Sequence, residues 1–463
     1  MKKLKTDVSA LMLYLFVAVV LIFFFICTVY SFIQYKIALS TPVAQLDCAQ
    51  VIAKSNPFLR FWGLFYYKNP IFFQDRDDLF NDWININFMV SSNSPYLVGG
   101  SSYPPLALLF AKFFVAMGDY TGGTVAARDQ TSGIVSILIY YAICVIPTVI
   151  LIFVACKRTK LKTWTICLLA LSLFLTVPFL FVFDRGNYVL LAVPFTFLFV
   201  LYYDSDAWWK REISYLSLAV AVGIKLYPAA FAFLLLRKKD VFGFIRTVFY
   251  CVLAVLLPFF CFDGGLENIG AFLYWLLDFS GSKGGVASEV VYGISYSYSP
   301  YNIVATLAAF FGEGVIDLGI AQTAITAERV GKAITLVCIV CILFTGLFSD
   351  KSWKIMLSAT LATLFVPSIS FVYSAVMMLF PVLFFLLDRD KEKKDWAYFG
   401  LFLVALAPVV TFNVVKYQVL GFRWGVSIKH LLEELSYFVL LFLLTADVAV
   451  SLIARAKRRK KQS

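Results

Sequence analysis

Four aspartates fall close together in the first fifth of the chain, in a pattern that could supply a general base. Asp75, Asp77, Asp78 and Asp82 lie within eight positions, with aromatic residues around them and Asn85 shortly after. A carboxylate held outside a membrane can take a proton from a hydroxyl group that acts as an acceptor. A solvated, turn-forming loop is the alternative explanation of the same cluster.

A second group of polar residues forms a very short turn between two apolar runs. Asp184, Arg185, Gly186 and Asn187 follow one another there. A cation and an amide at a tight glycine turn can coordinate an anion, and the guanidinium group suits phosphate because its donors form a fork. In the alternative reading, Arg185 simply pairs with Asp184 or with an aspartate of the first cluster.

Two further segments carry polar groups in apolar surroundings. Lys225 stands inside an apolar run, followed by Leu226, Tyr227 and Pro228. An ionisable residue in such a place is costly, so a functional role is the first hypothesis, and snorkelling to an interface is its rival. The tyrosine-rich segment 292–302 offers rings and hydroxyls that suit sugars, although they equally suit an interfacial belt.

The composition excludes a water-soluble protein. The 463 residues are 61% hydrophobic, 18% aromatic and only 15% charged, whereas soluble domains are about half apolar and about a quarter charged. Intrinsic disorder and nucleic-acid binding are excluded too, although the formal net charge is +12, because the basic residues gather at the ends of apolar runs. The chain is therefore predicted to be a polytopic membrane protein.

The residue types also limit the cofactors. His430 is the single histidine, and no Cys-x-x-Cys pair occurs, so a Ser-His-Asp triad and a histidine-ligated zinc site are not expected. Most of the nine cysteines lie in or beside apolar runs and are expected to be unpaired. We expect no metal ligands and no cofactor, and a divalent metal ion is the less favoured alternative.

The apolar runs are those of a helical membrane protein. A helical crossing takes about 20 residues, and runs near that length occur at 10–33, 132–155, 163–183, 241–262, 330–348, 353–371, 396–414 and 432–453. Short basic loops such as 157–162 and 388–395 join them, and the positive-inside rule assigns these loops to the cytoplasm. With the shorter runs included, we expect an all-α bundle of about 11–13 transmembrane helices.

Two shorter or interrupted runs do not fit a simple crossing. The run 103–117 opens with Tyr103, Pro104 and Pro105 and is predicted to be a partial or interfacial helix. The run 213–236 must begin and end on the same side, so we expect it to enter the membrane and turn back at residues 224–228, where a proline breaks the helix.

This topology leaves two long segments outside the cell. They are residues 34–131 and 263–329, and a shorter third one covers 416–430. The aromatic stretch 57–67 in the first of them is suited to lying in the headgroup plane. We expect residues 1–463 to form a single domain whose first apolar run is a retained anchor rather than a cleaved signal peptide.

Several of these motifs, taken in order, resemble a known enzyme family. Asp82 with the following Trp, then Tyr96 and Tyr103-Pro104-Pro105, is similar to a pattern of the multispan GT-C glycosyltransferases. The resemblance is strongest to glycosyltransferase family 87, the polyprenol-phosphate-mannose-dependent branch. Arg185-Gly-Asn187 resembles its Arg-Gly-Gln-x-Asn element with the Gln absent, Lys225-x-x-Pro228 its Lys-x-x-Pro element, and Tyr301-Asn302 a further loop motif.

The resemblance implies a GT-C-like glycosyltransferase that uses a polyprenyl-phosphate sugar on the extracytoplasmic face of the cell membrane. The sugar would be a hexose or pentose, with mannose favoured, and the acceptor a hydroxyl of a cell-envelope glycan or glycolipid. The transfer would invert the anomeric carbon. A lipid phosphate is a competent leaving group, so the absence of a P-loop or Rossmann motif from the sequence agrees with this reading.

The resemblance also assigns roles to individual residues. It makes Asp82 the general base. The donor phosphate would be bound by Arg185, Asn187, Lys225 and Tyr227. The acceptor or the sugar would be bound by Asp78, Asn85, Tyr103, Tyr301 and Asn302.

Three other functions are compatible with a multispan protein. A transporter or lipid flippase would fit a charge at mid-membrane and broken helices, but less well the carboxylates outside. A polysaccharide polymerase or ligase would be expected to carry several arginines on its large outer loop, whereas 263–329 holds only Lys283 and Arg329. A scaffolding protein would have no reason to bury Lys225.

Overall fold

The computed structural model describes most of the chain. The described residues are 2–40, 79–97, 100–120, 130–157, 159–279, 296–311, 321–367, 369–409, 413–419 and 422–460. Asp75, Asp77, Asp78 and the aromatic stretch 57–67 lie outside them, as does the segment 280–295. The predictions made for these residues therefore stay predictions.

The protein is an all-α polytopic membrane protein, as predicted. Five of the described helical segments are long and apolar enough to cross a membrane. They are formed by α1 (Lys2–Ser40), α7 (Thr131–Cys156), α13 with η3 (Val241–Leu256 and Leu257–Cys261), α17 (Ala321–Phe348) and α21 (Ile428–Lys460). The pair α8 (Thr163–Phe174) and α9 (Val177–Arg185) passes the same test together but is bent by 62°. The predicted span 163–183 is thus a broken helix.

The remaining helices are shorter. Their bounds are α4 Asn81–Ser91, α5 Pro105–Val115, α10 Val189–Tyr202, α11 Trp208–Ile224, η2 Tyr227–Ala232, α12 Phe233–Arg237, η4 Gly265–Glu267, α14 Asn268–Phe279, α16 Pro300–Phe311, α18 Ser352–Phe365, η5 Val372–Met378, α19 Leu379–Leu387 and α20 Asp395–Leu406. The helices α10, α18 and α19 bury residues on nearly every side, as expected of helices at the centre of a bundle. The expected number of 11–13 spans stays a prediction.

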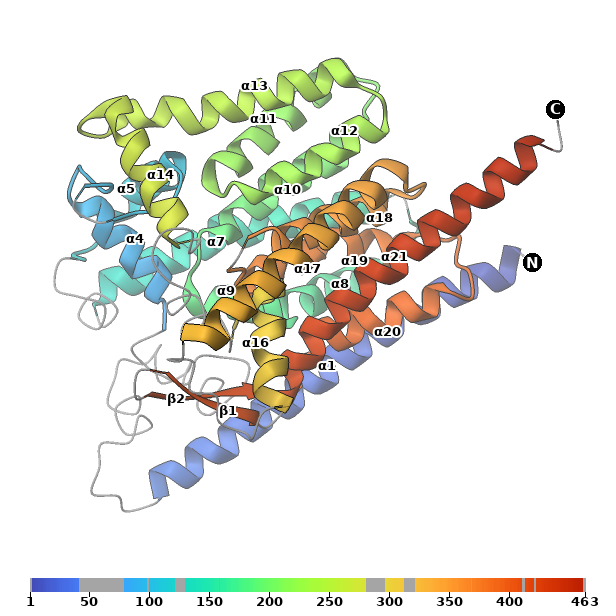
Figure 1. Ribbon diagram of the computed structural model, residues 1–463, viewed down its shortest axis with the longest axis horizontal. Helices are drawn as coiled ribbons and strands as arrows, with labels where there is room; N and C mark the ends of the chain where they lie inside the picture. The colour runs from blue at the N-terminus through green and yellow to red at the C-terminus, as the bar shows by residue number, and fades with distance from the viewer. Residues whose placement is uncertain are drawn as a thin grey trace.

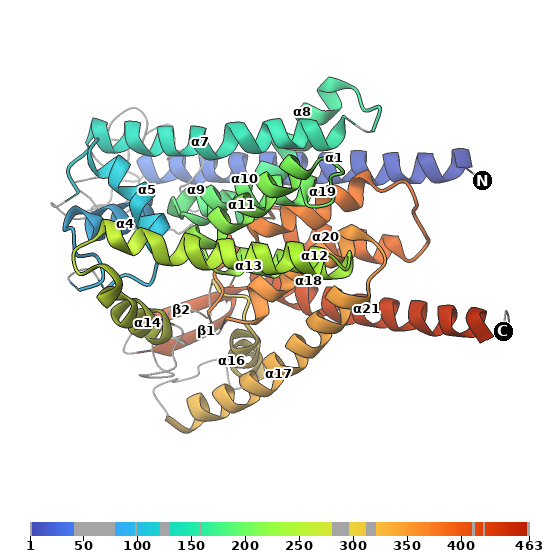
Figure 2. The same cartoon turned by 90° about the horizontal axis from the view of Figure 1, so that it is seen from above.

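Both chain termini lie at the same end of the bundle (Figures 1 and 2). We call this the terminal end and the opposite one the distal end. The basic connection between α7 and α8 and the one between α19 and α20 also lie at the terminal end, as Figure 2 shows. These are the loops that the positive-inside rule places together.

The run 213–236 breaks where the sequence predicts. The helix α11 ends at Ile224, Lys225 has extended backbone angles, and η2 begins at Tyr227 with a proline in its first turn. The chain then returns through α12 to the terminal end (Figure 1). The short α5 also fits its prediction, because its 11 residues span only about half of the length needed for a crossing.

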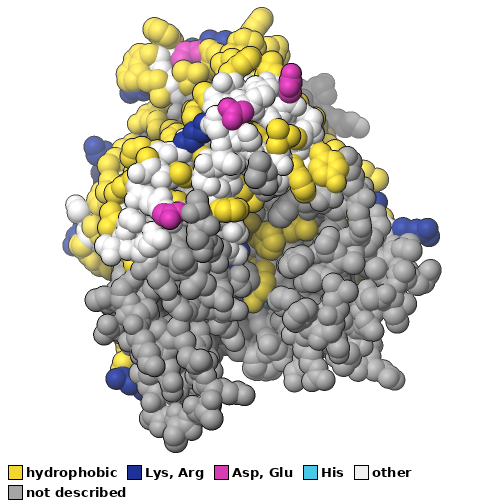
Figure 3. Space-filling view, turned by 90° about the vertical axis from the view of Figure 1, so that its left-hand side faces the viewer, with side chains coloured by type: hydrophobic (Ala, Val, Ile, Leu, Met, Phe, Trp, Pro, Cys, Tyr) yellow, Lys and Arg dark blue, Asp and Glu magenta, His cyan; other side chains and the backbone are white. Residues whose placement is uncertain are grey.

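The distal end contains short helices and a small sheet. The helix α14 runs across the direction of its predecessor α13 (Figure 1), an orientation suited to the plane of a membrane interface. The strands β1 (Asn413–Val419) and β2 (Phe422–Ser427) form an antiparallel hairpin. The sequence analysis did not expect strands in the segment 416–430. Figure 3 looks at this end, where the coloured residues include few charged side chains.

Candidate active site

The described member of the aspartate cluster, Asp82, lies in the first turn of α4. This helix begins after Phe80, which has a left-handed backbone with φ 58°. The backbone N–H of Phe80 donates to the carbonyl oxygen of Asp184 at 2.8 Å. The start of α4 is therefore tied directly to the turn 184–187 at the end of α9, although the two are about a hundred positions apart in the sequence.

This turn supplies hydrogen bonds to both carboxylate oxygens of Asp82. Arg185 Nη2 lies 2.7 Å from Oδ1, and Asn187 Nδ2 lies 2.7 Å from Oδ2. The side chains of Asp82 and Arg185 are mostly buried, with 16% and 13% of their area exposed. The alternative that Arg185 pairs with an aspartate of the first cluster is thus realised, and the partner is the predicted base itself.

Gly186 allows the turn after α9 to lie close to Trp83 of α4. Its φ of 62° lies in the left-handed region, and an added Cβ would come 2.7 Å from the Cβ of Trp83. The Trp83 ring stacks on Tyr188 with centroids 5.4 Å apart, so an aromatic layer supports the turn. Stacked aromatic pairs of this kind contribute about 0.5–1.5 kcal/mol beyond the area they bury.

Asn187 extends the site towards Tyr103 and Lys225. Its Oδ1 accepts from the backbone N–H of Val189 at 2.9 Å, and its Nδ2 also lies 2.9 Å from the hydroxyl oxygen of Tyr103. Burial raises the pKa of Tyr103 well above its ordinary value, so the hydroxyl keeps its proton. The Lys225 ammonium lies 3.8 Å from the centre of the Tyr103 ring, and within the described residues it makes no salt bridge.

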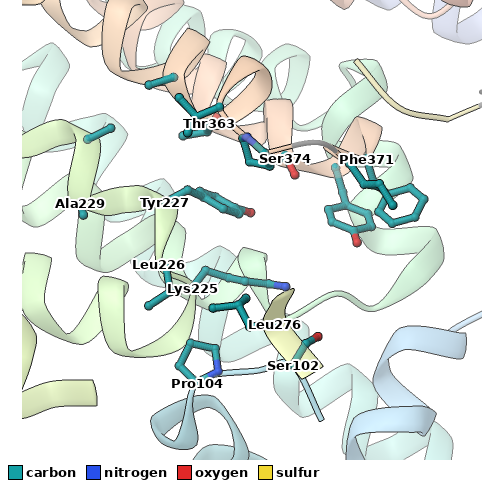
Figure 4. Close-up of a pocket in the computed structure, with 16 residues that line it drawn as sticks. Ser102, Pro104, Lys225, Leu226, Tyr227, Ala229, Leu276, Thr363, Phe371 and Ser374 are labelled. Carbon is teal, nitrogen blue, oxygen red and sulfur yellow. The ribbon is translucent and has the colours of Figure 1, made fainter. Parts of the chain in front are cut away.

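A pocket of about 430 Å³ adjoins Lys225. Figure 4 shows the lysine side chain extending into it, with Tyr227 and Ser374 on one side and Ser102 and Pro104 on the other. The other lining residues are mainly apolar and come from η2, α14 and the end of α18. The pocket thus has an apolar wall and a few polar groups, of which the lysine carries the charge.

The sequence analysis missed the contribution of η5. Phe371, Tyr373 and Ser374 line the pocket, and Tyr373 lies within electrostatic reach of Asp82 and Arg185. A bridge between Ser297 and Phe371 fixes the start of this element. The one signal in the sequence is a cluster of hydroxyl and aromatic side chains at the junction of the runs 353–371 and 372–387.

Two tyrosines of α7 were missed as well. The hydroxyl of Tyr140 donates to the carbonyl oxygen of Asn187 at 2.8 Å, and that of Tyr141 donates to the carbonyl oxygen of Phe183. They hold the two ends of the turn that carries Arg185. Within an apolar run, this pair gave no signal that distinguishes it from interfacial or core aromatics.

Other predicted site residues lie elsewhere or make other contacts. Asn302 is 4% exposed, donates to the carbonyl oxygen of Ser297 at 2.7 Å and faces Glu434 of α21. Tyr301 packs beside Gly331 of α17. Asn85 is half-buried on α4, and Asp78 lies outside the described residues. Hydrogen bonds and ring contacts therefore join Asp82, Arg185, Asn187, Tyr103 and Lys225, whereas Asn302 belongs to a separate buried cluster.

The described part of the chain holds no group of three His, Cys, Asp or Glu side chains placed to bind a metal ion. The arrangement around Asp82 instead offers a carboxylate, two cations and several hydroxyls beside an apolar pocket. Such a set can accept a proton on one side and hold an anion on the other.

Comparison with known proteins gives the family. The model of glycosyltransferase family 87 matches residues 102–374, which is more than half of the chain. The protein belongs to glycosyltransferase family 87. The matched region includes Tyr103, Arg185, Lys225 and Tyr373, while Asp82 precedes it and joins the site through its hydrogen bonds. No curated protein and no solved structure gave a match.

Proposed function

We propose that this glycosyltransferase transfers a sugar from a polyprenyl-phosphate donor to a hydroxyl of a glycan or glycolipid at the outer membrane surface. One observation carries the proposal. Asp82, Asn187, Tyr103 and Lys225 form a continuous series of contacts that ends at a largely apolar pocket. In this proposal Asp82 is the base and Lys225 binds the lipid phosphate, and Asn187 and Tyr103 link the two.

The donor would occupy the pocket with its phosphate at Lys225. The apolar residues of η2, α14 and α18 suit an isoprenoid chain, because burying apolar surface contributes about 25 cal/mol per Å². Lys225, Tyr227 and Ser374 offer an ammonium group and two hydroxyls to the phosphate. Arg185 is paired with Asp82, whereas Lys225 makes no salt bridge within the described residues and is the cation left for the phosphate.

The chemistry requires one proton transfer. The acceptor oxygen attacks the anomeric carbon, the bond from that carbon to the phosphate oxygen breaks, and Asp82 takes the proton of the acceptor hydroxyl. The electron pair of the broken bond leaves with polyprenyl phosphate. Direct displacement inverts the anomeric carbon, and Arg185 and Asn187 fix the orientation of the base from both sides.

The proposed side of the membrane follows from charge. The basic loops 157–162 and 388–395 lie at the terminal end, and the positive-inside rule assigns them to the cytoplasm. The α4 helix and the turn after α9 lie towards the distal end (Figure 1). The site would then face outward, where a hexose or pentose donor, with mannose favoured, meets acceptors of the cell envelope.

The test is a transfer assay with the purified full-length protein. It would be incubated with a panel of radiolabelled polyprenyl-phosphate sugars and a membrane-glycolipid fraction, with the matching nucleotide sugars as the control panel. We expect labelled glycolipid and free polyprenyl phosphate in equal amounts from at least one lipid donor. Transfer from nucleotide sugars alone, or donor movement without a covalent product, would refute the proposal.

A further inference from the structure

The hydroxyl of Tyr103 is oriented by its surroundings before any substrate binds. The backbone N–H of Tyr103 donates to Ser101 Oγ at 3.2 Å, and its carbonyl oxygen accepts from the Tyr96 hydroxyl at 3.0 Å. Trp275 of α14 donates in turn to the carbonyl oxygen of Tyr96 at 3.0 Å. The following Pro104 restricts the backbone of Tyr103 as well.

The direction of the hydrogen bond between Asn187 and Tyr103 follows from the other contacts of Asn187. The side-chain oxygen Oδ1 faces the backbone N–H of Val189 at 2.9 Å, and Nδ2 faces a carboxylate oxygen of Asp82. The reversed amide would set a donor against the N–H of Val189 and an acceptor against the carboxylate. Nδ2 therefore holds both hydrogens and gives one to Asp82 and one to the Tyr103 hydroxyl.

The Tyr103 hydroxyl is consequently an acceptor towards Asn187, and its own hydrogen must go elsewhere. Within the described residues, the contact with Asn187 is the one hydrogen bond of this hydroxyl, and the hydroxyl accepts in it. Tyr103 is partly buried, so a ligand that enters beside it can accept this hydrogen and complete the hydrogen bonding of the hydroxyl. The Lys225 ammonium, 3.8 Å from the centre of the same ring, would attract an anion to this place.

We propose that Tyr103 is a catalytic residue that donates a hydrogen bond to the departing phosphate of the lipid donor. This inference rests on the proposed function and changes the role expected for Tyr103, which the resemblance assigned to the acceptor or the sugar. Negative charge develops on the phosphate oxygen as its bond to the anomeric carbon breaks, and a preoriented donor stabilises that charge. The hydroxyl keeps its proton throughout, and the acceptor proton goes to Asp82.

The experiment replaces Tyr103 with Phe, which retains the ring beneath Lys225 and removes only the hydroxyl. We expect kcat to fall about 100-fold, the order found when one such donor is removed. The inhibition constant of the product, polyprenyl phosphate, should rise about tenfold or more, because one hydrogen bond to a charged group is lost. The KM of the acceptor should stay within twofold of the wild-type value.

Tyr215→Phe is the matched control. Tyr215 is fully buried, and its hydroxyl donates to Asp240 at 2.8 Å, outside the proposed site. This variant should retain the wild-type kcat and product inhibition, so that the general effect of removing a buried hydroxyl is measured separately. Replacing Tyr103 with 3-fluorotyrosine, a stronger donor of nearly the same shape, should retain at least wild-type product affinity.

The outcomes separate this inference from the proposed function. Wild-type transfer from a lipid donor with an unchanged kcat and product affinity in Tyr103→Phe would overturn the role of Tyr103 alone. A raised acceptor KM with unchanged product inhibition would return Tyr103 to the acceptor side. If the wild type makes no product, equilibrium binding of polyprenyl phosphate to the same two proteins still decides whether the hydroxyl contacts the phosphate.

Discussion

The proposed chemistry depends on a carboxylate that is oriented from both of its oxygens. Arg185 and Asn187 reach Asp82 from one turn, and the sequence predicted all three as site residues. It offered a pair between Arg185 and an aspartate of the first cluster only as an alternative and did not single out Asp82, because no local pattern relates positions about a hundred residues apart. Residue types indicate what a group can do, and the fold decides which groups meet.

The two cations should respond differently to substitution. Removing Arg185 leaves a largely buried carboxylate without its partner, so loss of folding and loss of donor binding would be mixed. Lys225 makes no salt bridge within the described residues, and its ammonium lies over the Tyr103 ring. Lys225→Met keeps the apolar stem, so its effect on donor binding should be measurable without a simultaneous loss of folding.

We expect Lys225→Met to weaken donor binding by about ten- to a hundredfold, the range for a lost hydrogen bond to a charged group. The melting temperature should change little, because a partly buried cation is replaced by an apolar side chain of similar length. Equilibrium binding of a polyprenyl-phosphate sugar and thermal unfolding would measure both. Wild-type donor affinity in this variant would exclude Lys225 from the phosphate site.

At the scale of elements, the sequence predicted where a helix breaks better than which distant segments contact one another. The end of α11 at Ile224 was predicted, since Lys225 and Pro228 mark it locally. The role of η5 was not, because Phe371 reaches the pocket through a bridge to Ser297, more than seventy positions away. The hairpin of β1 and β2 was also missed, because the sequence analysis treated 416–430 only as an outer segment.

The turn after α9 provides a test of how the fold holds Arg185 and Asn187 in place. Gly186→Ala places a Cβ in the left-handed region and 2.7 Å from the Cβ of Trp83. We expect a destabilisation of about 1–3 kcal/mol from the backbone strain alone and a loss of transfer activity that exceeds the loss of folded protein. Thermal unfolding in detergent and the transfer assay would measure the two effects.

Gly270→Ala is the control for that experiment. Gly270 lies in α14 and has no neighbouring atom within 4 Å of an added Cβ. Alanine there should be neutral or stabilise the helix by about 0.5–1 kcal/mol. If Gly186→Ala retained wild-type activity and stability, the left-handed turn would not be the feature that holds Arg185 and Asn187 in place.

For the whole molecule, composition was sufficient to predict the class and the grouping of the loops. Both termini and the basic loops lie at one end (Figure 2), as the distribution of Lys and Arg indicated. The packing order of the helices could not be predicted in the same way, because nearly every face of a membrane helix is apolar and the hydrophobic pattern then carries little information.

Membrane sidedness can be tested by labelling single cysteines in intact cells with a membrane-impermeant reagent. The background would carry Cys48→Ser and Cys261→Ser, since Cys48 falls in the predicted outer segment 34–131 and Cys261 is exposed near the distal end. We expect labelling of a cysteine introduced at Leu97, which is 69% exposed. Cysteines at Lys160 and Glu392 should react only after the cells are permeabilised. Labelling of either from outside would reverse the topology and place the site in the cytoplasm.

The central claim is that Asp82 is the general base, and the most direct measurement is transfer by Asp82→Asn at saturating donor. Asparagine keeps the size of the side chain but cannot take the acceptor proton. General-base contributions are about 100- to 10,000-fold, so the rate should fall at least 100-fold while donor binding persists. Asp75→Asn and Asp77→Asn should retain most of the activity. A near-normal rate in Asp82→Asn, with a large loss at Asp75 or Asp78, would contradict the assignment.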